Sequence, residues 1–170
     1  MHRARQSMPK TWILKKKGAK YISANGNSET LPLFILIRDF IGEIENRSGV
    51  KKIIKESEVK VNNKQVHDNK FPIRLNDIVE INKKYYVLLL GENKKIQVKE
   101  IKENHDKITL KVIGKILRKD KKVQINCSNG RNYLVSDKES EKIHTGDSVI
   151  INLKDKKIAE SLPLKENAKV

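Results

Sequence analysis

The sequence has very little cysteine and no long hydrophobic run. Cys127 is the only cysteine among 170 residues, so no disulfide can form within the chain, and this usage is typical of a reducing compartment. No stretch of about 18 apolar residues is present to span a membrane. The N-terminus also lacks the apolar core of a secretory signal. We therefore expect a cytoplasmic protein, with Cys127 as a small apolar residue on a strand.

Patterns typical of catalysis and of metal or cofactor binding are also missing. The four histidines lie in the N-terminal segment or in predicted turns, and no Cys/His cluster has the spacing of a zinc site. No serine stands in a nucleophile-elbow pattern, and no glycine-rich phosphate loop precedes a predicted helix. The carboxylates are scattered and mostly lie beside lysines, which does not indicate an acid/base pair. The sequence thus predicts no enzyme, no metal and no cofactor.

Acidic residues are few compared with basic ones. The chain has 37 Lys and Arg against 21 Asp and Glu, a net charge of +16, which indicates a polyanionic partner. Residues 1–20 contain two Arg, five Lys, one His and no acid. We interpret residues 1–30 as a basic extended arm that is disordered until a partner orders it. Trp12 in this arm is either an anchor onto its own domain or a platform on which a nucleotide stacks.

Residues 31–83 predict two helices followed by short strands. Apolar residues recur at helical spacing from Leu33 to Ile44, with Thr30 as the expected N-cap. Ser48 is the expected cap of a second, shorter helix with one apolar and one cationic face. The pattern then alternates, and Asn62-Asn63 predicts a tight turn between two strands, because asparagine tolerates the left-handed backbone conformation.

From Lys84 onward the pattern is that of short strands separated by turns. The runs are YYVLLL, IQVKEI, KITLKVIGKIL, KVQINC, NYLVS, DSVIINL and KIAESLPL. Regularly spaced short strands are typical of a small barrel or sandwich. We therefore place a domain boundary near Lys83-Lys84, with a β-rich, barrel-like central domain over residues 84–170. The expected fold class is α+β: the basic arm, the two-helix and short-strand module, then this β-rich domain.

The basic residues supply the candidate binding site. Arg47, Lys51 and Lys55 lie four residues apart and so share one face of the second predicted helix. A rigid row of cations can follow the regularly spaced phosphates of RNA. The lysine pairs 94–95, 121–122 and 156–157 are most simply solvated turns. The candidate RNA-binding residues are Arg3, Arg5, Lys10, Trp12, Lys15, Lys16, Lys17, Arg38, Arg47, Lys51, Lys52, Lys55, Lys60 and Lys64.

This helical segment resembles the RNA-binding module named after bacterial small-subunit ribosomal protein four. The module has a basic turn, a helix that ends Leu-Ile, a short linker and then Val-x-Val-Asn-Gly-Lys. The corresponding residues here are Arg47-Ser48, Ile53-Ile54, Glu56-Ser57 and Val59-Lys60-Val61-Asn62-Asn63-Lys64. Ser57 and Asn63 replace two glycines of that pattern. Synthetases, pseudouridine synthases and stress proteins also carry the module, so the module alone does not define a role.

Nearly the whole chain is similar to the archaeal and eukaryotic ribosomal protein S-four-e family. The matching segments, in order, are MHRARQSMPKTWILKKKGAKY, LPLFILIRDFIG, KFPIRLNDIVEI, VQINCSNGRNYLV and GDSVIINLKDKKIAESLPLKENA. The resemblance implies a protein of the cytoplasmic small ribosomal subunit that binds rRNA near its five-prime domain. It also implies neighbouring small-subunit proteins as partners and no homo-oligomer. The shortness of the chain favours an archaeal member.

The family usually continues past LPLKENA into a further small barrel of the KOW type. This chain stops at Val170, so we expect either a naturally short protein or a truncated one.

Two alternatives to a structural rRNA-binding role stay open. The first is an RNA-modification or RNA-quality-control factor that uses the same module for targeting. Such a factor needs a catalytic acid or a cofactor site, and residues 85–170 show neither pattern. The second is a partner of acidic membranes through the basic arm. The structural role, without chemistry and without a membrane, is the favoured hypothesis.

Overall fold

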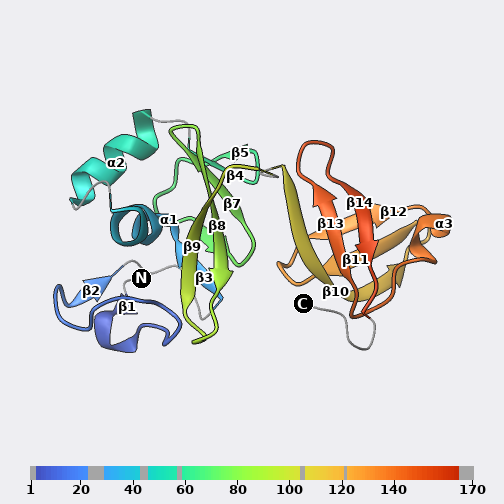
Figure 1. Cartoon of the computed structure of the whole chain (residues 1–170), viewed down its shortest axis with the longest axis horizontal. Helices are drawn as coiled ribbons and strands as arrows, with labels where there is room; N and C mark the ends of the chain where they lie inside the picture. Colours follow the sequence, from blue (N-terminus) through green and yellow to red (C-terminus); the bar gives the residue numbers. More distant parts are fainter. Residues whose placement is uncertain are drawn as a thin grey trace. The chain divides into compact units, whose positions relative to one another are not determined.

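The protein folds into two compact units, residues 1–105 and 106–170, which are described separately (Figure 1). The computed structural model describes residues 3–22, 29–42, 46–56, 59–103, 106–120 and 122–164. Each unit contains a five-stranded antiparallel sheet with few, short helices, so the predicted α+β class is confirmed. Within the described ranges, no helix has both the length and the apolar character needed to cross a membrane. The sequence predictions that concern His2, Ile44, Ser57, His105, Lys121 and residues 165–170 lie outside the described residues.

The main sheet of unit 1 has the strand order β5-β4-β7-β8-β9. The strands are β4 (Lys60–Val61), β5 (Lys64–Gln65), β7 (Ile78–Ile81), β8 (Lys84–Leu90) and β9 (Ile96–Ile101). Asn62 and Asn63 connect β4 to β5 with φ angles of 51° and 61°. Two consecutive positive φ angles match the twist of a tight hairpin, so the turn predicted at this asparagine pair is confirmed.

Strands β8 and β9 belong to unit 1. The boundary expected near Lys83-Lys84 falls in the turn between β7 and β8, whose residues pair from Ile78↔Val87 to Ile81↔Lys84. The structure divides instead between residues 105 and 106. A local pattern identifies a strand but not its partner, which is why strands of two different sheets were predicted to form one domain.

The helices of unit 1 begin at other residues than predicted. Thr30 lies in β3 (Thr30–Pro32), which pairs with β6 (Pro72–Arg74), so its predicted role as a helix cap is wrong. The first helix is α1 (Leu33–Ile35), which continues as a π-helix over Leu36–Ile41 and ends at Gly42 in the left-handed conformation. The second is α2 (Arg47–Glu56). The Val50 N–H donates to the Asn46 carbonyl at 3.1 Å, so Ser48 lies inside the first turn rather than at the cap.

The core of unit 1 includes residues of the basic N-terminal segment. Val50 and Ile54 of α2 are buried as predicted, and they belong to the same apolar cluster as Trp12 and Ile22. β1 (Arg3–Ala4) pairs with β2 (Tyr21–Ile22), and a 3-10 turn follows β1. The prediction of an extended, unpacked arm is therefore wrong for residues 3–22. One buried indole and one isoleucine supply enough apolar surface to dock a segment that composition alone describes as polar.

The sheet of unit 2 has the strand order β12-β11-β10-β13-β14 and is strongly curled (Figure 1). Its strands are β10 (Lys107–Leu117), β11 (Val123–Cys127), β12 (Asn132–Val135), β13 (Ser148–Asn152) and β14 (Lys157–Leu162). The first half of β10 pairs with β13 and the second half with β11, with a register shift between Val112 and Gly114. Such a bulge bends the strand and increases the local twist, which lets one strand serve both neighbours.

Two further features of unit 2 concern single residues. Cys127 is 2% exposed on β11, and burial raises the pKa of its thiol to about 11, so the predicted apolar role on a strand is confirmed. The short helix α3 (Asp137–Ser140) was not predicted. Ser136 and Glu139 form a capping box at its start, a signal that the sequence pattern Ser-x-x-Glu carries.

In each unit, a turn closed by an aspartate side chain precedes a strand that has neighbours on both sides. Asp77 precedes β7 and accepts a hydrogen bond from the Arg74 N–H at 2.9 Å. Asp147 precedes β13 and accepts one from the His144 N–H at 2.8 Å. The second carboxylate oxygen of Asp77 accepts from the Asn62 side chain, and that of Asp147 accepts from the Leu164 N–H. Each aspartate therefore ties the entry of its strand to a more distant segment.

Candidate nucleic-acid interface

Helix α2 presents lysines on the side opposite its buried residues. Lys51, Lys52 and Lys55 are exposed. Lys52 lies 3.9 Å from Glu56, whereas Lys51 and Lys55 make no ion pair with any residue that the structure describes. The backbone of Arg47 begins the helix, and its side chain lies outside the described part of the chain. The predicted spacing thus places Lys51 and Lys55 one helical turn apart, both without an acidic partner among the described residues.

A cleft of about 530 Å³ lies beside α2. Its lining residues are Ser48, Lys51, Lys52, Ile54, Lys55 and Glu56 from α2, with His67 and Asn69 from the segment between β5 and β6. This segment is fixed, because the Asn69 carbonyl accepts from the Phe34 N–H at 2.9 Å and the Asp68 side chain accepts from the Lys70 N–H at 2.8 Å. His67 and Asn69 were not predicted as site residues, since no local pattern relates them to α2.

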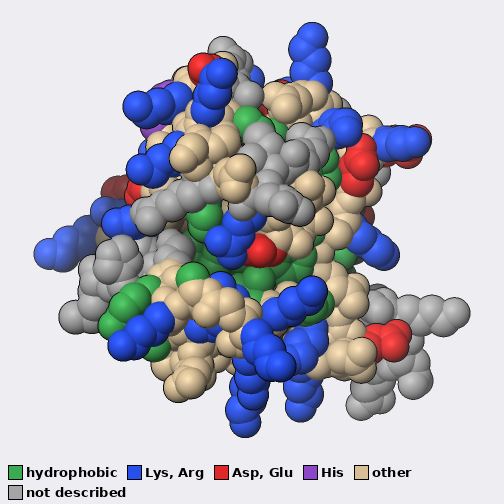
Figure 2. All heavy atoms as spheres, turned by 90° about the vertical axis from the view of Figure 1, so that its left-hand side faces the viewer, with side chains coloured by type: hydrophobic (Ala, Val, Ile, Leu, Met, Phe, Trp, Pro, Cys, Tyr) green, Lys and Arg blue, Asp and Glu red, His purple; other side chains and the backbone are tan. Residues whose placement is uncertain are grey.

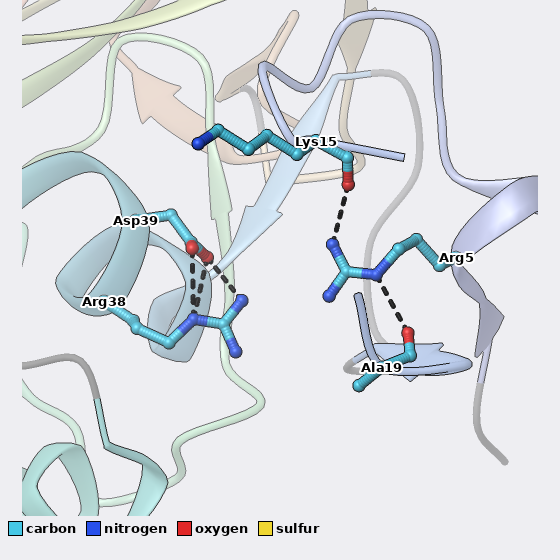
Figure 3. Close-up of polar contacts among 5 residues, drawn as sticks. All are labelled: Arg5, Lys15, Ala19, Arg38 and Asp39. Atoms are coloured by element: carbon cyan, nitrogen blue, oxygen red, sulfur yellow. Dashed lines mark hydrogen bonds and ion pairs between the residues drawn. The ribbon is translucent and has the colours of Figure 1, made fainter. Parts of the chain in front are cut away.

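The N-terminal segment displays a second group of cations. Lys10, Lys15, Lys16 and Lys17 are all exposed, and Arg3 is half-buried. Arg5 holds the loop that carries three of these lysines, because its Nε donates to the Ala19 carbonyl at 2.9 Å and its Nη1 to the Lys15 carbonyl at 2.8 Å (Figure 3). The guanidinium of Arg5 is thus engaged with the backbone and shapes the lysine loop.

The structure ties this segment to the rest of unit 1. The Ile96 N–H donates to the Thr11 carbonyl at 2.8 Å, and the Lys95 ammonium donates to the Lys10 carbonyl. The Trp12 Nε1 donates to the Thr30 carbonyl at 3.0 Å. Trp12 is only 2% exposed, so of its two predicted roles the structure shows the anchor. A base has no exposed indole face to stack on, and Trp12 leaves the set of candidate RNA contacts.

Arg38 and Lys60 have acidic neighbours. Arg38 makes a two-pronged contact with Asp39, 2.6 Å at its shortest, and its guanidinium carbon lies 4.8 Å from the centre of the Phe34 ring (Figure 3). Lys60 lies 3.9 Å from Glu80. Lys64, in contrast, is exposed on β5. The charges of Arg38 and Lys60 are thus partly neutralised within unit 1, which makes them weaker candidates than the lysines of α2.

Cations dominate the face of unit 1 that carries α2 and the N-terminal segment. Figure 2 shows Lys and Arg side chains projecting from both ends of this face, with few Asp or Glu among them. The larger cleft of unit 2, about 890 Å³, differs in charge. Its charged lining residues are Lys138, Lys142 and Lys157 with Glu139, Glu141 and Glu160. Because these charges balance, this second cleft does not favour a polyanion.

The described part of the chain contains no metal-site arrangement of three or more His, Cys, Asp or Glu side chains. The fold and the surface together define a basic α+β protein of two units with a cationic face on the first.

Comparison with known proteins gives the family. The model described as Ribosomal family S4e matches residues 82–158. The small ribosomal subunit protein eS4 of Archaeoglobus fulgidus is 32% identical over 176 residues, covering 100% of this chain and 73% of that protein. The protein of the same name from Nanoarchaeum equitans is 30% identical, covering 96% of this chain and 72% of that protein. This chain therefore belongs to the S4e family of ribosomal proteins, as its resemblance predicted, and these relatives are archaeal.

A solved structure supports the fold. The crystal structure of the 30S ribosomal protein S4e from Thermoplasma acidophilum matches with a TM-score of 0.68 at 24% identity, covering 81% of this chain and 70% of that one. The match concerns the arrangement of the backbone.

Proposed function

We propose that this protein is a structural component of the cytoplasmic small ribosomal subunit that binds rRNA and performs no chemistry. The observation that carries the proposal is the pair Lys51 and Lys55, exposed one turn apart on α2 without an acidic partner among the described residues. The two relatives are named small ribosomal subunit protein eS4, which supports the proposed place of this chain in the small subunit. The partners that we propose are rRNA near the five-prime domain and neighbouring small-subunit proteins, with a single copy of this chain.

The proposed mechanism is neutralisation of phosphates that repel one another. Residues 31–83, as a module of the ribosomal-protein-four type, would present the α2 lysines to the RNA backbone. The lysine loop of residues 15–17, held by Arg5, would contact a second stretch of backbone. Contacts of this kind fix register and recognise shape, with little reading of base identity. The role thus requires rigid cations rather than a reactive group.

The first experiment is sedimentation of a cell lysate on a sucrose gradient, with and without a high-salt wash. We expect the protein to migrate with the small subunit. We also expect it to stay there after the wash, because in the assembled subunit the proposed contacts to neighbouring proteins add to the salt-sensitive contacts with rRNA. A protein that remains at the top of the gradient, or leaves the subunit after mild salt, would contradict the structural role and favour a transient RNA-modification or quality-control factor.

Charge reversal locates the interface on the protein. The variant Lys51→Glu/Lys55→Glu should lower affinity for a five-prime-domain rRNA fragment and reduce the slope of log affinity against log salt by about two, one for each lost phosphate contact. The matched control is Lys119→Glu/Lys122→Glu, which makes the same change of charge at exposed residues of unit 2. Equal losses in the two variants would show that net charge, not the α2 face, determines binding.

A further inference from the structure

We infer that the cleft beside α2 holds one unpaired nucleotide of the bound RNA. The inference rests on the proposed rRNA-binding role and specifies which part of the RNA this site takes. A paired backbone needs only a row of cations on an open surface. The cleft adds a concave space of about 530 Å³, within the usual range of small-ligand sites.

The cleft offers one set of groups to a phosphate. Lys51 and Lys55 lie on its helical side, and both are exposed and without an ion pair among the described residues. Among the described residues of the lining, Glu56 supplies the only carboxylate, and it lies 3.9 Å from the Lys52 ammonium. The lining therefore keeps an excess of positive charge that a phosphate group would balance.

The lining residues from the segment between β5 and β6 offer groups that suit a base rather than a phosphate. The exposed imidazole of His67 is a planar ring, and aromatic side chains of this kind stack on unpaired bases. The carboxamide of Asn69 carries both a donor and an acceptor, as the edge of a base does. Ile54 also lines the cleft, although it is only 1% exposed.

The segment that carries His67 and Asn69 is held in place before any ligand arrives. The Asn69 carbonyl is bonded to the start of α1 through the Phe34 N–H. The Phe71 N–H donates to the Asp68 carbonyl at 3.0 Å, which closes the turn that carries Asn69. A fixed segment lowers the entropy lost on binding and favours a specific occupant over a diffuse ion atmosphere.

The test compares RNA hairpins that differ only in pairing. The probes are hairpins closed by a non-nucleotide linker: four carry a single bulged A, G, C or U, and one is fully paired and carries a terminal phosphate, so that all have the same number of phosphates. Dissociation constants are measured with the full chain at low salt, where even sequence-independent phosphate binding is strong enough to compare. The variants are His67→Ala and Asn69→Ala, with His144→Ala as the matched control. Like His67, His144 is exposed, but it lies in unit 2.

We expect the wild-type chain to bind at least one bulged hairpin about tenfold more tightly than the paired one, the size of one base-stacking contact. His67→Ala and Asn69→Ala should bring this ratio close to one without changing affinity for the paired hairpin, and His144→Ala should leave the ratio intact. Equal affinity for all five hairpins, or a ratio that survives both cleft variants, would overturn the inference while leaving rRNA binding in place. No binding to any hairpin, together with absence from the small subunit, would overturn both proposals.

Discussion

The carboxylate of Asp147 shows how one buried side chain supports unit 2. Asp147 is 5% exposed, and its two oxygens accept hydrogen bonds from the Leu164 N–H at 2.9 Å and the His144 N–H at 2.8 Å. These two donors lower the pKa of the carboxyl below its ordinary value. The charged form is thus the one that the fold stabilises, and it joins the start of β13 to the chain that follows β14.

Asp147→Asn should destabilise the protein by about 1–3 kcal/mol, because the amide nitrogen would face a backbone N–H and leave a buried donor unsatisfied. The sign of the pH effect follows from the lowered pKa. Wild-type stability from this group is complete above the unfolded pKa near 4 and is lost as pH falls through the lower folded pKa. Urea unfolding between pH 3 and 7 should therefore show the difference between wild type and variant shrinking at acid pH.

The control for this prediction is Asp120→Asn, at an exposed loop residue whose side chain makes no hydrogen bond or ion pair with the described residues. It should leave the free energy of unfolding unchanged across the same range of pH. A stability gap between wild type and Asp147→Asn that stays constant down to pH 3 would contradict the assigned role of the charged carboxylate.

Arg5 shows why composition does not determine what a basic residue does. It was predicted to contact phosphate, and its guanidinium instead bonds two carbonyls of the lysine loop. Gly18 in this loop has a φ of 132°, a conformation that side chains rarely adopt, and packs against the same guanidinium. The planar guanidinium of arginine presents its donors in a fixed geometry that suits a contact with two carbonyls at once. Arg5 thus serves the proposed interface by positioning the lysines.

At the scale of elements, the N-terminal segment depends on Trp12. This residue is the only tryptophan of the chain, so its fluorescence reports on the docking of residues 3–22 without interference. We expect emission typical of a buried indole, weak quenching by iodide, and little change when an rRNA fragment is added, because the ring is 2% exposed. Strong quenching by iodide, or strong quenching on binding RNA, would instead support the stacking role.

Some elements could be predicted from the sequence because their signals are local. The predicted run KITLKVIGKIL coincides with β10, since strict alternation identifies a strand without knowledge of its partners. The Asn62-Asn63 turn was predicted from the backbone preference of asparagine. The placement of Thr30 in a strand could not be predicted, because it depends on pairing with β6, far along the chain. The π-helix over Leu36–Ile41 carries no local sequence signal that separates it from an α-helix.

The candidate site was predictable to a similar extent. Lys51 and Lys55 were found because helical periodicity places them on one face. His67 and Asn69 reach the same cleft only because the fold brings the segment after β5 beside α2, and a single sequence carries no sign of this proximity. The burial of Trp12 was left open for the same reason, since its acceptor, Thr30, lies 18 residues away.

For the whole molecule, the excess of charge has two opposing effects. A net charge of +16 raises the energy of the folded chain through self-repulsion, and the cations of unit 1 have few acids nearby to offset it. The same cations would attract the phosphates of the proposed RNA partner. Salt screens both effects, with a Debye length of about 10 Å at 0.1 M.

Raising the salt concentration should therefore stabilise the free protein and weaken its binding to RNA. If about six phosphates are neutralised, affinity for a five-prime-domain rRNA fragment should fall by roughly 10³ between 50 and 200 mM salt. Over the same range, the Tm of the free chain, followed by circular dichroism, should rise. A Tm that falls with salt would mean that ion pairs within the fold outweigh self-repulsion. An affinity that resists salt would mean that apolar or base contacts, rather than the lysines of α2 and the N-terminal segment, supply most of the binding free energy.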